Sequence, residues 1–60
     1  MDVFVEQSGG GLWSTEKASG WRICPGGSLD IVADDEEGEA FVIASFAAGK
    51  WKHVENREEI

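Results

Sequence analysis

The sequence predicts an all-β domain, or a small α+β one: a compact antiparallel meander or small barrel of five to six short strands. Three observations predict this fold class. Short runs of β-branched, aromatic and aliphatic residues recur along the chain, and glycine-rich turn sequences separate them. The length of 60 residues leaves room for one core only. We therefore expect residues 1–60 to form a single small domain.

The first part of the chain contains three predicted strands. Residues 3–5 are a β-branched and aromatic run that ends before three consecutive glycines. Residues 12–15 form the second expected strand, and a polar turn leads from it to a third at residues 21–24. Trp21 and Ile23 would share one face of that third strand because side chains alternate along a strand.

A tight turn and the clearest strand follow. Residues 25–28 read Pro-Gly-Gly-Ser, in which proline fixes φ at the second turn position and Gly26 supplies the positive φ of a type II turn. The next strand, residues 29–33, places Asp30 on one face. Its other face is apolar and consists of Leu29, Ile31 and Ala33.

The last part of the chain begins with an acidic loop at residues 34–39. The almost wholly apolar run at residues 40–46 predicts a central strand that is covered on both faces. Residues 51–54 form the last expected strand, with Trp51 and His53 on the same side.

A helix is the alternative for the C-terminal segment. Ala47, Trp51 and Val54 lie at the i, i+4 and i+7 positions of a helical face. Gly49 disfavours that helix by about 1 kcal/mol, so the strand is preferred. The C-terminal tail, residues 55–60, is expected to be frayed or helical.

The composition excludes several classes of partner. Twelve Asp and Glu against five Lys and Arg give a formal net charge of −7 at pH 7. Such a surface repels nucleic acid and anionic membranes and attracts basic proteins. We expect no secretory signal, because residues 1–5 lack a basic region and a long apolar stretch, and the sequence has no run of roughly 18 apolar residues. A single cysteine excludes an intramolecular disulfide, so we expect a soluble cytoplasmic protein.

No motif predicts catalysis, a cofactor or a metal. The glycine run at residues 9–11 lacks the lysine of a phosphate-binding loop, and the acidic loop lacks the ligand spacing of an EF-hand. Cys24 and His53 are too few for a four-ligand zinc site. Nothing in the local sequence places a nucleophile beside His53. We therefore expect a protein that is not an enzyme and needs no cofactor.

The predicted function is noncatalytic binding to another protein. Closely spaced carboxylates approach the charge density of duplex DNA, about one charge per 1.7 Å, so they could occupy a basic, nucleic-acid-binding site and inhibit the partner. Small acidic inhibitors without cofactors occur among phage-encoded proteins, and this analogy of size and charge predicts a phage protein. The expected partner-binding residues are Asp30, Asp34, Asp35, Glu36, Glu37, Glu39, Trp13 and Trp51.

Two other functions remain open. The first is a small structural or self-associating β subunit that forms a homo-oligomer through the strand at residues 40–46 and through tryptophan contacts. Trp13 and Trp51 could also be core residues, and the acidic loop could serve only to keep the protein soluble. The second is a barrel that binds a peptide or single-stranded nucleic acid on exposed aromatic residues. Its basic groove would have to come from Arg22, Lys50 and Lys52.

Overall fold

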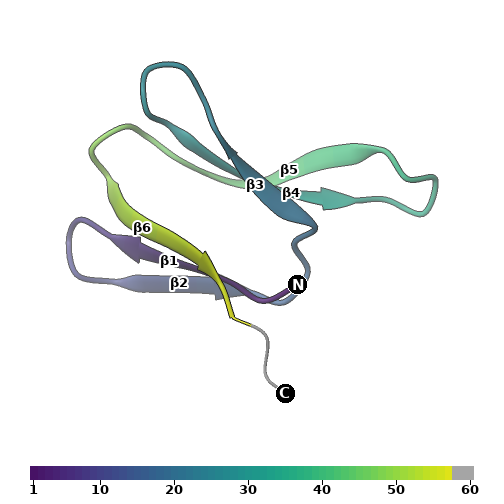
Figure 1. Cartoon of the computed structure of the whole chain (residues 1–60), viewed down its shortest axis with the longest axis horizontal. Coiled ribbons are helices and arrows are strands. Elements are labelled where there is room, and N and C mark those ends of the chain that lie inside the picture. Colours follow the sequence, from purple (N-terminus) through teal and green to yellow (C-terminus); the bar gives the residue numbers. More distant parts are fainter. Residues whose placement is uncertain (58–60) are drawn as a thin grey trace.

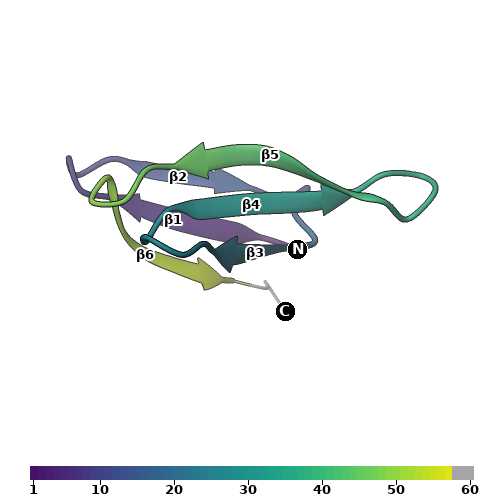
Figure 2. The same cartoon turned by 90° about the horizontal axis from the view of Figure 1, so that it is seen from above.

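The computed structural model describes residues 1–57 and shows six strands in two antiparallel three-stranded sheets (Figure 1). The first sheet has the order β2-β1-β6 and the second has the order β3-β4-β5. Seen from above, the second sheet covers the first, with β4 over β1 (Figure 2). The strands are β1 (Val3–Gln7), β2 (Leu12–Thr15), β3 (Gly20–Ile23), β4 (Leu29–Asp34), β5 (Ala40–Phe46) and β6 (Trp51–Asn56).

The predicted all-β fold of five to six short strands is confirmed, and the two sheets do not close into a barrel. β1 and β2 form a hairpin, β3 to β5 form a meander, and β6 returns to pair with β1. The helix considered for the C-terminal segment is wrong, because residues 51–56 form a strand.

The core lies between the central strands of the two sheets. Period-2 alternation turns four aliphatic side chains inward, and all four are fully buried: Val3, Val5, Leu29 and Ile31. Each of the four edge strands adds one half-buried aromatic side chain that packs against this core: Trp13, Trp21, Phe46 and Trp51. A domain with so few aliphatic core residues therefore depends on aromatic side chains to exclude water from its sides.

The turn before β4 has the predicted form. The amide of Gly27 donates to the carbonyl of Cys24 at 2.9 Å, and Gly26 has a φ of 95°. A positive φ at this position is what glycine permits and other residues resist. The turn also contacts the other sheet, since the indole Nε1 of Trp51 donates to the carbonyl of Gly27 at 3.0 Å.

The prediction that residues 40–46 form a central, doubly covered strand is wrong. β5 is an edge strand, and the central strand of its sheet is β4. The register passes from Ile31 opposite Ala44 to Val32 opposite Val42, which leaves Ile43 as the extra residue of a bulge. Because of the bulge, consecutive residues Ile43 and Ala44 both pack against the core.

A second bulge, in β6, changes which side chains of that strand face the core. Val54 lies opposite Val5 and Trp51 lies opposite Gln7, so an extra residue falls between them. Trp51 and Val54 consequently both pack against the core, whereas the side chain of His53 is exposed. The prediction that Trp51 and His53 share one side is therefore wrong.

The predicted fraying of the C-terminal tail is wrong for the residues that the structure describes. Asn56 pairs with Val3, and the amide of Arg57 donates to the carbonyl of Asp2 at 2.8 Å. These contacts hold residues 55–57 against β1, the central strand of the sheet. Residues 58–60 lie outside the described part of the chain.

Candidate protein-binding site

The hairpin formed by β4 and β5 projects past the end of the first sheet (Figures 1 and 2). Every residue from 34 to 42 is exposed, whereas the other end of the hairpin covers the core. We call residues 34–42 the hairpin tip. It contains five carboxylates and no basic residue, so it concentrates negative potential on the most projecting part of the molecule.

Asp35 organises the loop at the hairpin tip. Its backbone amide donates to the carbonyl of Glu39 at 2.9 Å, and its carbonyl accepts from the amide of Gly38 at 3.0 Å. Its carboxylate Oδ1 accepts from the amides of Glu37 and Glu39, both at 2.9 Å. The side chain of Asp35 thus turns back into the loop and fixes its shape, as Asp does in many turns.

The other four carboxylates of the hairpin tip are free to meet a partner. Within residues 1–57, none of them forms a side-chain hydrogen bond or an ion pair, and all are exposed: Asp34, Glu36, Glu37 and Glu39. Because Asp35 already fixes the backbone of this loop, a loop that binds would lose little backbone freedom, which favours affinity.

Two apolar residues of the hairpin tip were not predicted as site residues. Phe41 is 48% exposed and Val42 is 45% exposed. They pair with Ala33 and Val32 and therefore face opposite sides of the sheet. The apolar sequence of β5 indicated burial, and the sequence gives no signal for a hairpin that extends beyond the other sheet. Aromatic anchors within a polar rim are typical of protein interfaces, so Phe41 suits a contact surface.

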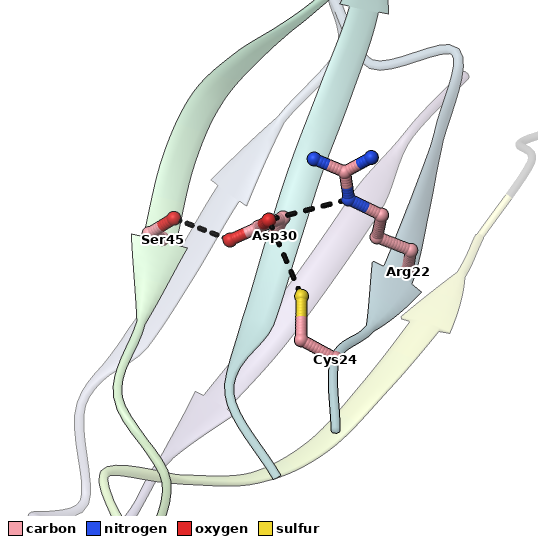
Figure 3. Close-up of polar contacts among 4 residues, drawn as sticks. All are labelled: Arg22, Cys24, Asp30 and Ser45. Atoms are coloured by element: carbon pink, nitrogen blue, oxygen red, sulfur yellow. Dashed lines mark hydrogen bonds and ion pairs between the residues drawn. The ribbon is translucent and has the colours of Figure 1, made fainter. Parts of the chain in front are cut away.

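Asp30 lies apart from the hairpin tip, on the outer face of the second sheet (Figure 3). Its carboxylate accepts hydrogen bonds from Ser45 Oγ at 2.5 Å, Arg22 Nε at 3.3 Å and Cys24 Sγ at 3.4 Å. These bonds join the three strands of the sheet. These hydrogen bonds hold the pKa of Asp30 below its usual value, and the bond from Ser45 has the largest effect, followed by those from Cys24 and Arg22.

The hydrogen bonds around Asp30 account for an aspartate at this position without any need for a binding partner. Its side chain is only 16% exposed, and both carboxylate oxygens already have donors. Asp30 and Asp34 are four positions apart along β4, roughly 13 Å at about 3.3 Å per residue. The structure therefore does not place Asp30 in the acidic loop, and its contact with a partner stays a prediction.

Trp13 and Trp51 lie at the other end of β4 from the acidic loop. The ring of Trp13 meets Phe46 edge to face, with centroids 5.5 Å apart, and Trp51 donates to Gly27 in the turn before β4. Both side chains are half-buried against the core. The structure brings the acidic residues 34–39 together and leaves these tryptophans apart, so their role at an interface stays a prediction.

The outer face of the first sheet has a shallow, open depression. It is lined by Asp2, Phe4, Ser14, Thr15, Glu16 and Lys17. Beside it the guanidinium of Arg57 lies 4.7 Å from the centre of the Phe4 ring and 2.9 Å from the carboxylate of Glu55. The hydrogen bond from Arg57 is the main cause that lowers the pKa of Glu55. The arrangement is a surface cation–π and ion-pair contact that attaches the C-terminal segment to β1.

Residues capable of acid–base or metal chemistry are dispersed. His53 is on β6 of the first sheet with its side chain 62% exposed, whereas the free thiol of Cys24 is beside β3 of the second sheet. Within residues 1–57 no group of three or more His, Cys, Asp or Glu could hold a metal ion. That same part of the chain contains no helix long and apolar enough to cross a membrane. In comparisons with known proteins, no family model, curated protein or solved structure matches this chain.

Proposed function

We propose that this chain is a noncatalytic protein-binding module whose hairpin tip occupies a basic site on a partner protein. The observation that supports this proposal is the shape of the β4–β5 hairpin, which extends an acidic loop beyond the rest of the fold. A loop used only for solubility would need neither this projection nor the internal hydrogen bonds of Asp35. Projection and preorganisation are both features that favour docking into a concave site.

The partner that fits best is a nucleic-acid-binding protein. Residues along a strand are about 3.3 Å apart and paired strands about 4.8 Å apart, so carboxylates on one hairpin loop approach the charge spacing of a nucleic-acid backbone. A groove lined with Lys and Arg would accept the loop, and Phe41 and Val42 would contact apolar surface at its rim. Occupation of the groove would exclude nucleic acid, which makes inhibition the expected consequence.

The free thiol of Cys24 supports a reducing, cytoplasmic setting for this encounter. Its Sγ donates to a carboxylate oxygen of Asp30 at 3.4 Å, so the thiol already has a hydrogen-bond partner within the second sheet. We therefore assign Cys24 to the hydrogen-bond network of the second sheet and give it no reactive role.

The test is affinity capture from the source cells with three immobilised forms of the protein. The first is the wild type, and the second carries Glu36→Gln, Glu37→Gln and Glu39→Gln. The third is a charge-matched control with substitutions outside the hairpin tip: Asp2→Asn, Glu6→Gln and Glu16→Gln. Each triple variant raises the formal net charge from −7 to −4, so any difference between them reports position and not total charge.

We expect the wild type and the control to retain a basic protein that salt releases and that duplex DNA displaces. The tip variant should lose that protein. Equal retention by all three forms would contradict the role of the hairpin tip. Retention that salt and DNA leave unchanged would contradict the nucleic-acid-binding class of partner.

A further inference from the structure

Gly20 begins β3, and the packing of residues 1–57 gives no reason for a glycine there. Its φ lies outside the positive range that favours glycine, unlike the φ of Gly26. Apart from its chain neighbours, no heavy atom lies within 4 Å of the position that a Cβ would take, so a side chain would fit. Glycine weakens a strand and often marks a place where a ligand or another backbone approaches closely. Gly20 therefore indicates contact with another molecule.

Gly20 belongs to an apolar row on the outer face of the second sheet. It lies opposite Val32 of β4, and Val32 lies opposite Val42 of β5. Ile31 and Ala33 are buried on the inner face, so Val32 and its two partners face outward. Val32 is half-buried, Val42 is 45% exposed, and the space on the Gly20 side of Val32 is open. We call Gly20, Val32 and Val42 the apolar row.

The apolar row is continuous with the hairpin tip. Val42 belongs to both, and Asp34 follows Val32 by two positions on the same face, roughly 7 Å away at about 3.3 Å per residue. On the other side of the row, the carboxylate of Asp30 already has its hydrogen-bond donors. A basic residue that meets the exposed Asp34 would therefore bring neighbouring side chains of the same partner over the apolar row.

We propose that the apolar row receives an aliphatic side chain of the protein that binds the hairpin tip. Val32 and Val42 would contact this side chain, and the missing side chain at Gly20 would let the partner approach the backbone of β3. The side chains of the row carry no polar group, so a polar side chain would lose its water there without gaining a partner. This inference rests on the proposed function and adds the face of the hairpin that the partner covers.

Isothermal titration calorimetry with the captured protein tests the apolar row. Gly20→Ala and Gly20→Leu fill the open space by increasing amounts and should raise the dissociation constant severalfold and about tenfold, respectively. Gly9→Ala and Gly9→Leu are the matched controls, because Gly9 also has an ordinary φ and open space, in the turn between β1 and β2. They should leave the dissociation constant unchanged. Urea unfolding of each variant confirms that it is folded.

Salt separates this inference from the role of the hairpin tip, because it screens charge contacts and leaves apolar contacts almost unchanged. The loss of affinity in Gly20→Leu should be the same factor at low and high salt. The loss in the variant with Glu36, Glu37 and Glu39 changed to Gln should shrink as salt rises.

The possible outcomes distinguish the two proposals. If Gly20→Leu binds like the wild type while the triple tip variant binds weakly, the apolar row is overturned and the role of the tip stands. A loss in Gly20→Leu alone would overturn the role of the tip and, with it, the shared partner. A wild type that retains no protein would overturn both. Self-association that Gly20→Leu abolishes in sedimentation velocity would assign the apolar row to a second copy and also overturn the inference.

Discussion

The two ends of β4 have opposite surroundings. At its beginning, Leu29 is fully buried, and the preceding turn receives a hydrogen bond from Trp51 of the other sheet. At its end, Asp35 holds the acidic loop through hydrogen bonds from the amides of Glu37 and Glu39, and every residue from 34 to 42 is exposed. β4 therefore connects a buried end, which stabilises the fold, with an exposed end, which is accessible to a partner.

The comparison shows how a domain of 60 residues divides its surface. A chain of this size has few residues available for a core, so it can bury only part of a long hairpin. Here the tryptophans cover the end near Gly27, whereas Phe41 and Val42 at the other end are 48% and 45% exposed. Stability and binding should then respond to different substitutions.

Trp51→Ala should give the largest loss of stability. Removal of a half-buried indole that packs against the core should lower the free energy of unfolding by about 3 kcal/mol. Trp51→Phe keeps a ring but loses the hydrogen bond to Gly27 and should cost about 1 kcal/mol in addition to any repacking. Urea unfolding followed by circular dichroism measures both. A Trp51→Ala variant as stable as the wild type would remove the contrast between the two ends.

The triple tip variant, with Glu36, Glu37 and Glu39 changed to Gln, should alter binding and leave stability alone. Its association rate with the captured partner should fall about tenfold at low ionic strength, and the salt dependence should flatten. Its free energy of unfolding should stay within about 0.5 kcal/mol of the wild type. Stopped-flow association and urea unfolding give the two quantities. An unchanged rate, or a large loss of stability, would show that the two ends do not have separate roles.

Asp35→Ala should loosen the loop of the hairpin tip and cause a small loss of stability. The change removes the acceptor of two backbone amides, so we expect a loss of about 1 kcal/mol in stability and faster hydrogen exchange at Glu37 and Glu39. Asp35→Asn is the matched control because it removes the same charge and keeps the Oδ1 acceptor. Equal exchange rates in the two variants would mean that the carboxylate does not fix the loop.

The smallest expected effect is the loss of stability at acidic pH that results from protonation of Asp30, on the outer face of the second sheet. The pKa of Asp30 is lowered in the folded protein, so its stabilising contribution is complete above about pH 3.9 and is lost as the pH falls through the folded pKa. Ser45→Ala removes the largest cause and should move the pKa of Asp30 back toward its ordinary value. A carboxyl-carbon NMR titration measures it. An Asp30 that titrates at its ordinary value in the wild type would contradict the network.

Much of the fold could be predicted from the sequence because the relevant signals are local. The alternation of Leu29, Ile31 and Ala33 gave the inner face of β4, and the turn with Gly26 gave the hairpin before it. The pairing of β6 with β1 joins opposite ends of the chain, and no local pattern specifies it. The bulge at Ile43 likewise depends on how two sheets meet, so the faces of β5 could not be assigned correctly.

The candidate site was predictable only in part, for the same reason. The acidic run at residues 34–39 is contiguous, so the sequence placed these carboxylates together. Asp30 was grouped with them by proximity in sequence, but β4 carries it to the opposite end of the hairpin, where Ser45 donates to it. The exposure of Phe41 results from the reach of the hairpin beyond the first sheet, which is a property of tertiary structure.

Hydrogen–deuterium exchange of the protein, free and bound to its captured partner, tests most directly whether the two ends of β4 differ in function. We expect slower exchange on binding at residues 34–42, with no change at residues 24–28 or at Trp51. Protection confined to the turn at residues 24–28, to the tryptophans or to the outer face of the first sheet would contradict it. In that case the acidic loop would serve as charged surface alone.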